Sequence, residues 1–228
     1  MTSLPRLQGA DELLDDPDHD PGVLEGSLKQ IAGVNRWLGG RRALIRHLGE
    51  WIEGGARKIL DVGTGCGDLP MAVRDWGERR GVKVEITAVD AHPQIASLAA
   101  RRTGMPVAVS DGLHLPFRDD SFDVALLSMT LHHFDGAAQL RMLGEMARVA
   151  SQHLLVNELH RSWPNYLGSK LLAATLWRGN HLTRHDGPIS VLRAFTPGEL
   201  VSLAKESGLV RPRVYRHFFF RLVLTAEL

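Results

Sequence analysis

The segment Ile59–Pro70, which reads ILDVGTGCGDLP, is the most informative part of this chain. A short apolar strand runs into Asp61, and Gly63, Gly65 and Gly67 then alternate with other residues before a helix begins. Glycine adopts positive φ and has no side chain, so this turn can bring backbone N–H groups close to a ligand. The following helix offers its positive end to a carboxylate or phosphate. The segment therefore predicts a site for a nucleotide-type cofactor.

The spacing of the three glycines disfavours a dinucleotide. An NAD-binding fingerprint reads Gly-x-Gly-x-x-Gly, whereas Gly63, Gly65 and Gly67 fall at every second position. Asp68 is placed to cap the next helix, and Pro70 lies in its first turn, where a missing N–H costs little. A purely structural glycine turn stays open on these residues alone, so the ligand has to be identified from the downstream sequence.

The composition indicates one domain without a strong charge. The 228 residues are 44% hydrophobic, which suits one buried core with an appendage. The net charge of +1 argues against a nucleic-acid partner. Cys66 is the single cysteine, which excludes a disulfide framework and fits a reducing cytoplasm. No apolar run approaches ~18 residues, so neither secretion nor a membrane span is expected.

The histidines and the acidic start of the chain predict little specific structure. The pairs His132-His133 and His181/His185 lack partners that would indicate a metal site, so no metal is expected. Residues 1–20 are acidic, carry prolines and have little apolar content, which predicts a loosely ordered segment.

Two helices, expected at Val23–Leu38 and Arg41–Glu53, precede an alternation of strands and helices. The expected strands are Lys58–Val62, Val82–Val89, Pro106–Ser110, Phe122–Ser128 and His153–Asn157. The expected helices between them are Leu69–Arg80, Pro93–Thr103 and Gly136–Val149. Such alternation implies an α/β fold with right-handed crossovers and a parallel sheet covered on both faces. Ligands of these sheets bind beyond the carboxyl ends of the strands.

The alternation is interrupted after the fifth strand. Residues 161–190 predict a helical insertion over the site. Thr196 and Glu199 form a capping box, with Pro197 at the first position of a helix that ends at Ser207. Val210–His217 and Phe219–Ala226 then predict two strands with a tight connection, and hence an antiparallel ending.

Acidic residues end further strands beside the glycine turn. Asp90 ends the second strand, where a carboxylate can accept both hydroxyls of a ribose. Asp111 ends the third strand, where an acid with neighbouring N–H groups can read an adenine edge. Three strand ends thus supply polar positions for three parts of one ligand.

With these residues in place, the chain from about Lys58 to Leu228 resembles the class I S-adenosylmethionine-dependent methyltransferases. The resemblance is carried by Asp61–Gly67 (DVGTGCG), Asp90, Ser110–Phe117 (SDGLHLPF) and Asp119–Ala125 (DDSFDVA). The last two segments are similar to those of small-molecule enzymes of the ubiquinone/menaquinone and polyketide-tailoring types. The resemblance implies a Rossmann-like seven-stranded, mostly parallel sheet with an antiparallel last strand. It also implies an N-terminal helical lid.

The resemblance implies S-adenosylmethionine as cofactor and S-adenosylhomocysteine as its product. By this analogy the glycine turn approaches the methionine portion, Asp90 holds the ribose, and Asp111 with Leu113 reads the adenine. Asp61 acts through water or by orienting the loop, and Arg36 meets the methionine carboxylate or an anionic substrate unless it is a surface arginine. The cofactor-binding residues implied are Asp61, Gly63, Thr64, Gly65, Gly67, Asp90, Ala91, Asp111, Gly112, Leu113, Ser128, Met129 and Arg36.

Methyl transfer from a sulfonium needs a base only when the acceptor must lose a proton, as a phenol or alcohol does. His133 and His132, which follow the fourth strand, are the first candidates for acceptor contact or proton removal. The alternative is that one caps the strand end and the other supports the cofactor loop. Glu158, at the end of the fifth strand, and His185, in the insertion, are further candidates.

The expected function is methylation of an apolar or aromatic small molecule, with oxygen as the favoured target, in secondary metabolism. C-methylation of a quinone-like precursor and a non-catalytic S-adenosylmethionine-binding scaffold are the alternatives. The expected organisation is an acidic segment and helical lid over 1–54 and a methyltransferase domain over 55–228, with 161–190 facing the acceptor. The expected partner is a small-molecule acceptor; the oligomeric state is open, a homodimer included.

Overall fold

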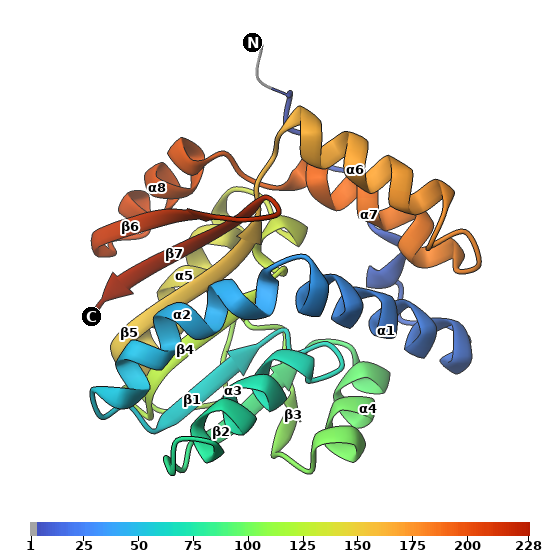
Figure 1. Ribbon diagram of the computed structural model, residues 1–228. Coiled ribbons are helices and arrows are strands. Elements are labelled where there is room, and N and C mark those ends of the chain that lie inside the picture. Colours follow the sequence, from blue (N-terminus) through green and yellow to red (C-terminus); the bar gives the residue numbers. More distant parts are fainter. Residues whose placement is uncertain (1–3) are drawn as a thin grey trace.

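The computed structural model, which describes residues 4–228, has a seven-stranded sheet between layers of helices (Figure 1). The strand order is β3-β2-β1-β4-β5-β7-β6. The strands are β1 (Lys58–Val62), β2 (Glu85–Asp90), β3 (Val107–Val109), β4 (Phe122–Ser128), β5 (Ala150–Leu159), β6 (Val210–His217) and β7 (Arg221–Glu227). β1 to β5 pair in parallel, and β7 runs antiparallel to both β5 and β6. The predicted mostly parallel sheet with an antiparallel last strand is confirmed.

The helices begin and end close to the predicted positions. They are α1 (Pro21–Trp37), α2 (Gly40–Glu53), α3 (Asp68–Glu78), α4 (Pro93–Thr103), α5 (Ala137–Val149), α6 (Trp163–Ala174), α7 (His181–Arg193) and α8 (Pro197–Glu206), with short 3-10 turns at Leu13–Asp15 and Leu131–His133. The capping box of Thr196 and Glu199 at α8 is present. Asp68 does not cap α3, because Gly67 occupies the N-cap position and Asp68 is already inside the first turn.

Alternating side chains decide which helices cover each face of the sheet. Leu126 of β4 belongs to an apolar cluster that includes Leu44 of α2 and residues of α3. The next residue, Leu127, belongs to the opposite cluster, with Leu143 of α5 and residues of α8. A slip of one residue in register would exchange these two faces, so the burial of both fixes the pairing.

The N-terminal strap, residues 4–20, is packed against the rest of the molecule, contrary to the prediction of a loosely ordered segment. Leu4 and Glu12 are buried. The N–H groups of Leu13 and Leu14 donate to the Asp186 carboxylate on α7 at 2.8 and 3.0 Å. The strap's partners are distant in sequence, so its composition could not reveal them. The first three residues covered by that prediction lie outside the described part of the chain.

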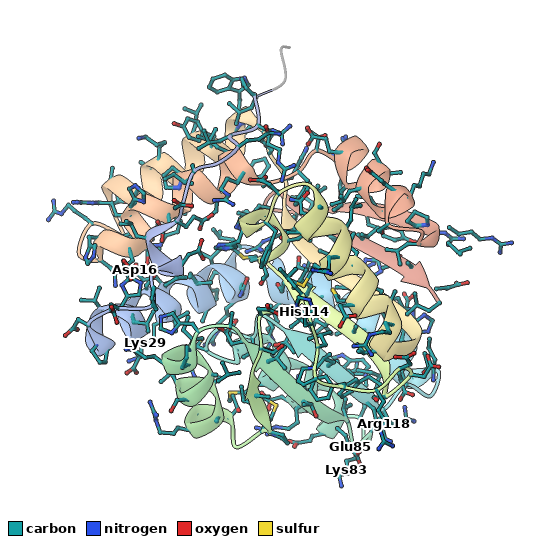
Figure 2. All side chains as sticks on the ribbon, turned by 180° about the vertical axis from the view of Figure 1, so that it is seen from behind. Asp16, Lys29, Lys83, Glu85, His114 and Arg118 are labelled. Carbon is teal, nitrogen blue, oxygen red and sulfur yellow. The ribbon has the colours of Figure 1, made fainter. Side chains whose placement is uncertain are left out.

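The strap, α1 and the insertion gather beyond the carboxyl ends of the parallel strands. α6 and α7 lie side by side, with α1 next to them (Figure 1). In Figure 2, Asp16 of the strap and Lys29 of α1 lie at the left, whereas Lys83 and Glu85, just before and at the start of β2, lie at the lower right. Among residues 4–228, no helix combines the length and apolar character needed to cross a membrane.

Candidate active site

Two adjoining cavities lie at this edge of the sheet. The first, the glycine-turn cavity, has a volume of about 290 Å³ and is lined by the turn after β1, the strap, α1 and the ends of β2 to β4. The second, the apolar cavity, measures about 360 Å³ and lies between the strap, α1, α6, α7 and the turn before β7. Leu14, Ile31, Met129 and His133 line both. The arrangement suits two ligands held next to each other.

The glycine turn has the backbone conformation that its sequence predicts. Gly63, Gly65 and Gly67 have φ of 67°, 55° and 73°. A Cβ on Gly63 would collide with the side chain of Thr130. The Gly63 N–H donates to the carbonyl of Val89 in β2 at 2.9 Å. Glycine is therefore required here both by φ and by the close approach of the turn to the segment after β4.

Asp90 fastens the glycine turn from the end of β2. Its Oδ2 accepts the Gly65 N–H at 2.9 Å, and its Oδ1 accepts the His92 N–H at 3.0 Å. Burial raises the pKa of Asp90, although these two N–H groups favour its ionised form. Each carboxylate oxygen keeps a further lone pair, so Asp90 can still accept hydroxyl groups of a ligand in the cavity that it lines.

Asp61 is a buried acid at the end of β1. Burial, together with the nearby charges of Asp68 and Asp90, raises the pKa of Asp61 to about 7. A cationic ligand in the glycine-turn cavity would favour the ionised form. Binding of a cationic ligand would therefore lower the pKa of Asp61 and release its proton.

The end of β3 supplies an exposed acid. Asp111 lines the glycine-turn cavity, and its Oδ1 accepts the N–H groups of Leu113 and His114 at 2.9 and 3.1 Å. Leu113 itself is not among the lining residues, and its N–H is donated within the loop. The N–H that the resemblance assigns to an adenine ring is thus already hydrogen-bonded to Asp111.

The structure brings ten of the thirteen predicted cofactor residues to the glycine-turn cavity. They are Asp61, Gly63, Thr64, Gly65, Asp90, Ala91, Asp111, Gly112, Ser128 and Met129. Gly67, Leu113 and Arg36 lie outside its lining. Gly67 acts at the start of α3, where a Cβ would collide with Thr103.

Arg36, which was predicted to meet the ligand, does not line the glycine-turn cavity, and its neighbour Asn35 lines it instead. The Arg36 guanidinium lies over the Trp37 ring at 4.9 Å and lines a separate surface groove. Asn35 is the residue that enters the glycine-turn cavity, where its Nδ2 donates to Asp68 Oδ2 at 3.2 Å. Successive residues of a helix point about 100° apart, so the two side chains cannot share one direction.

His132 and Glu158 form a buried pair beneath the apolar cavity. His132 Nδ1 lies 2.8 Å from Glu158 Oε2, and both side chains are almost fully buried. Burial opposes ionisation of Glu158, yet the contact with His132 holds the pKa of Glu158 below its ordinary value. Glu158 therefore carries charge and orients the imidazole of His132.

His133 stands between the two cavities. Its Nδ1 lies 2.9 Å from Asp15 Oδ1 on the strap. Burial would lower the pKa of His133, but the charges of Glu12 and Asp15 outweigh it and raise this pKa to about 9. In this arrangement the imidazole holds its proton at neutral pH, which makes it a poor proton acceptor by itself.

The expectation that the histidine pair lacks partners is wrong. Glu12 of the strap lies with its carboxylate oxygens 3.6 Å from His132 Nε2 and 3.8 Å from His133 Nε2. The three side chains form a group of metal-ligand type. Glu12 is far from the two histidines in the sequence, so no spacing motif could predict this group.

His185 is placed away from both cavities. Its Nδ1 lies 2.8 Å from Asp186 Oδ1, and its side chain is half exposed. It lines neither cavity, whereas Asp186 lines the apolar cavity and holds the strap. The sequence interpretation of His185 as a base that closes over the acceptor is therefore not supported by its position.

Arg221 is a site residue that the sequence did not single out. It is 1% exposed, lines the apolar cavity and donates from Nη2 to Asn35 Oδ1 at 3.2 Å. Its Nε and Nη1 are buried without a hydrogen-bond partner among the described residues. Burial lowers the pKa of Arg221 to about 10. In the sequence Arg221 lay inside the predicted strand Phe219–Ala226 and carried no signal of a role in the site.

Comparison with known proteins agrees with this geometry. Residues 59–153 match a family model described as "Methyltransferase domain". Demethylmenaquinone methyltransferase of Deinococcus radiodurans is 34% identical over 122 residues, which cover 51% of this chain and 46% of the relative. The ubiquinone/menaquinone biosynthesis C-methyltransferase of Laribacter hongkongensis is 34% identical over 113 residues, covering 46% and 44%. The chain thus spans less than half the length of these relatives.

Solved structures share the fold. A methyltransferase from Aquifex aeolicus, described as dependent on S-adenosylmethionine, superposes with a TM-score of 0.62 at 20% identity, covering 92% of this chain and 99% of that one. Magnesium protoporphyrin IX methyltransferase of Synechocystis, with bound S-adenosylhomocysteine, gives a TM-score of 0.55 at 14% identity and covers 83% of each chain.

A sheet of this order, a glycine turn after β1 and an acid that ends β2 together define a class of cofactor-binding protein. With the matched domain over residues 59–153, they make the chain similar in sequence and fold to the class I S-adenosylmethionine-dependent methyltransferases. S-adenosylmethionine is the methyl donor of that class.

Proposed function

We propose that this protein transfers a methyl group from S-adenosylmethionine in the glycine-turn cavity to a hydroxyl oxygen of an apolar, aromatic small molecule in the apolar cavity. The observation that carries the proposal is the wall that the two cavities share, formed by Leu14, Ile31, Met129 and His133. A donor and an acceptor on either side of this wall would meet at its residues.

The cofactor fits the polar positions of its cavity. Its methionine portion would lie against Gly63–Gly67, its ribose at Asp90 and its adenine toward Asp111. The acids Asp61 and Asp68 give this cavity a negative potential, which favours a ligand that carries a sulfonium and an ammonium group.

The reaction is an in-line displacement in which the hydroxyl proton passes to solvent and the phenolate oxygen bonds to the methyl carbon as the carbon–sulfur bond breaks and S-adenosylhomocysteine leaves. The sulfonium charge disappears, so positioning and exclusion of bulk water lower much of the barrier. Met129 stands at the shared wall with a φ of 54°, an uncommon conformation for a residue other than glycine. Its N–H donates to the Asn157 carbonyl at 2.8 Å, which holds the segment after β4 in place. A rigid wall of this kind fixes the direction from which an acceptor can approach.

The apolar cavity supports an acceptor with an apolar body and a polar oxygen. Leucines of α6, Trp177 and the turn before β7 are among the apolar residues that line it. Arg221 supplies two buried donors without partners in the same cavity. A hydroxyl or phenolate oxygen would satisfy these donors, and a phenolate would gain from the charge as well. This pairing favours oxygen as the methylated atom.

C-methylation of a quinone-like precursor is the second candidate. It is favoured by the names of the two curated relatives. Both candidates use an aromatic acceptor that carries oxygen substituents, so one substrate can distinguish them by the position of the new methyl group. A non-catalytic scaffold would bind the cofactor and form no product.

The test is incubation of the purified protein with S-adenosylmethionine and a panel of alkylated hydroquinones and their dimethyl ethers, which lack a free hydroxyl. Release of S-adenosylhomocysteine is measured, and the methylated position is assigned by nuclear magnetic resonance. The proposal predicts an aryl methyl ether, formed only from acceptors with a free hydroxyl. A ring-methylated product would support the second candidate, and cofactor binding without turnover on any acceptor would support the scaffold. Asp90→Asn, which weakens the cofactor site, is the control for protein-dependent turnover.

A further inference from the structure

Glu12, His132 and His133 place three ligand atoms around one point at the junction of the two cavities. These atoms lie within 4.8 Å of one another. Glu12 Oε1 is 3.6 Å from His132 Nε2, and Glu12 Oε2 is 3.8 Å from His133 Nε2. Both separations exceed the range of a hydrogen bond. Ligands bound to one metal ion at about 2.1 Å each lie roughly 3–3.5 Å apart, so small side-chain movements would close the group around an ion.

Each imidazole is oriented by its own carboxylate. His132 Nδ1 lies 2.8 Å from Glu158 Oε2, and His133 Nδ1 lies 2.9 Å from Asp15 Oδ1. In metal sites a ligating histidine almost always donates its other ring N–H to a carboxylate, carbonyl or water, which fixes the tautomer and raises the basicity of the ligand. The same arrangement occurs here twice and turns both Nε2 atoms toward Glu12. His133 holds a proton while the site is empty, so an ion that binds at its Nε2 would displace that proton.

Glu12 has an oxygen that the protein leaves without a partner. Oε2 accepts a hydrogen bond from Ser190 Oγ at 2.7 Å. Oε1 is buried and has no hydrogen-bond partner among the described residues, and the whole residue is 4% exposed. A buried carboxylate oxygen without a partner is costly, and a cation would satisfy it.

The charges around the group also favour a cation. Glu12 and Glu158 are buried, and Asp15 adds a third carboxylate at the edge. Arg193 is one cation near the group, and its donors go to the backbone carbonyls of the two histidines at 2.8 and 2.6 Å. Arg221 also lines the apolar cavity, and its hydrogen bond goes to Asn35. No guanidinium nitrogen is shown bonded to Glu12, so the carboxylate is free to act as a ligand.

We propose that Glu12, His132 and His133 bind one divalent transition-metal ion of the Zn²⁺ or Mn²⁺ kind. Two imidazoles and one carboxylate suit these ions better than Mg²⁺ or Ca²⁺, which prefer sites made of oxygen ligands. Three protein ligands leave at least one position open, and all three residues line the apolar cavity. An oxygen of the acceptor would take that position beside the wall shared with the cofactor. This last clause rests on the proposed function, whereas metal binding does not.

The test begins with the full chain dialysed against a chelator and titrated with Zn²⁺ and, separately, Mn²⁺ by calorimetry. One equivalent is expected per chain. Glu12→Gln and His132→Ala should each weaken binding by at least about 100-fold, and Glu158→Gln by about 10–100-fold. His181→Ala, an exposed histidine of α7 outside the group, is the matched control and should bind as the wild type does. X-ray absorption of the zinc-loaded wild type, which depends on no variant, should show two imidazoles in the coordination sphere.

Absence of stoichiometric binding, or equal binding by Glu12→Gln and wild type, would overturn the metal site. So would an absorption spectrum without two imidazoles. The proposed function is tested separately on the same samples, because Asp90→Asn should lose affinity for S-adenosylmethionine while it retains Zn²⁺. Methyl transfer by a chain that binds no metal overturns this inference alone, and zinc binding without methyl transfer to any acceptor overturns the proposed function alone.

Discussion

Glu12 Oε1 lies 3.6 Å from His132 Nε2, which joins the N-terminal strap to the 3-10 turn after β4. Residues of the strap line both cavities at this point. Asp186 on α7 holds the strap in place by accepting hydrogen bonds from the N–H groups of Leu13 and Leu14. The strap therefore belongs to the site, although it precedes the matched methyltransferase domain in the sequence.

Replacement of Gly63 should damage both stability and cofactor binding. Gly63→Ala places a Cβ against Thr130 at a φ of 67°, so unfolding free energy should fall by about 2–4 kcal/mol. The matched control is Gly144→Ala on α5, where a Cβ meets no atom within 4 Å and stability should rise by about 0.5–1 kcal/mol. Urea denaturation measures both. Equal stability of the two variants would contradict the geometry of the turn.

Cofactor affinity should rise with pH through neutrality. The pKa of Asp61 is raised to about 7, and its ionised form favours a cationic ligand. If binding requires the ionised acid, the dissociation constant of S-adenosylmethionine should fall about tenfold between pH 6 and pH 8. Asp61→Asn cannot titrate, so the difference between it and the wild type isolates this group in calorimetric titrations. The same pH dependence in both proteins would contradict the role of Asp61.

Replacement of Arg221 should weaken acceptor binding without lowering the stability of the fold. Its guanidinium is fully buried with two unpartnered nitrogens, so Arg221→Met should leave unfolding free energy unchanged or raise it by about 1–3 kcal/mol. The same change removes the donors that an acceptor oxygen would use, and KM for the acceptor should rise by at least tenfold while the affinity for S-adenosylmethionine stays constant. An unchanged KM would exclude Arg221 from acceptor recognition.

A second histidine pair, His47 and His217, lies outside the two cavities and should make the stability of the fold depend on pH. His47 Nε2 lies 3.0 Å from His217 Nε2, and burial, with the charges of His217 and Arg46, lowers the pKa of His47 to about 4. Its folded pKa lies below the unfolded value near 6.5, so its contribution is present above that value and is lost as pH falls toward 4. The stability difference between wild type and His47→Gln should shrink by about 2 kcal/mol from pH 8 to pH 5. Denaturation at the two pH values measures it, and a constant difference would contradict the shift.

The elements that the sequence predicted correctly are those with strong local signals. Short apolar runs located β1 and β4 to the residue, and the predicted bounds of α4, Pro93–Thr103, match the structure. The last strand was placed two residues early, because Phe219 and Phe220 adopt positive φ and form the turn, although their side chains resemble those of a strand. Local conformation at such a turn is imposed by strand pairing, which residue type does not report.

The parts of the site that the sequence missed depend on long-range contacts. Glu12, Asn35 and Arg221 come from three distant segments and meet only because the sheet order brings β7 beside β5 and the strap across α7. The residues that line the glycine-turn cavity at the ends of β1 to β4 were accessible to sequence reasoning because they follow the strands closely. The sequence did not reveal which side chain of α1 points into the cavity. Arg36 was predicted to do so, but Asn35 lines the cavity.

The most direct test of the central claim uses S-adenosylmethionine labelled with deuterium in its methyl group. The labelled cofactor is incubated with the protein and a hydroquinone acceptor, and both products are quantified by mass spectrometry. We expect an aryl ether that carries the intact trideuteromethyl group, in equal amount to S-adenosylhomocysteine. Label recovered on ring carbon, or S-adenosylhomocysteine formed without labelled acceptor, would contradict it.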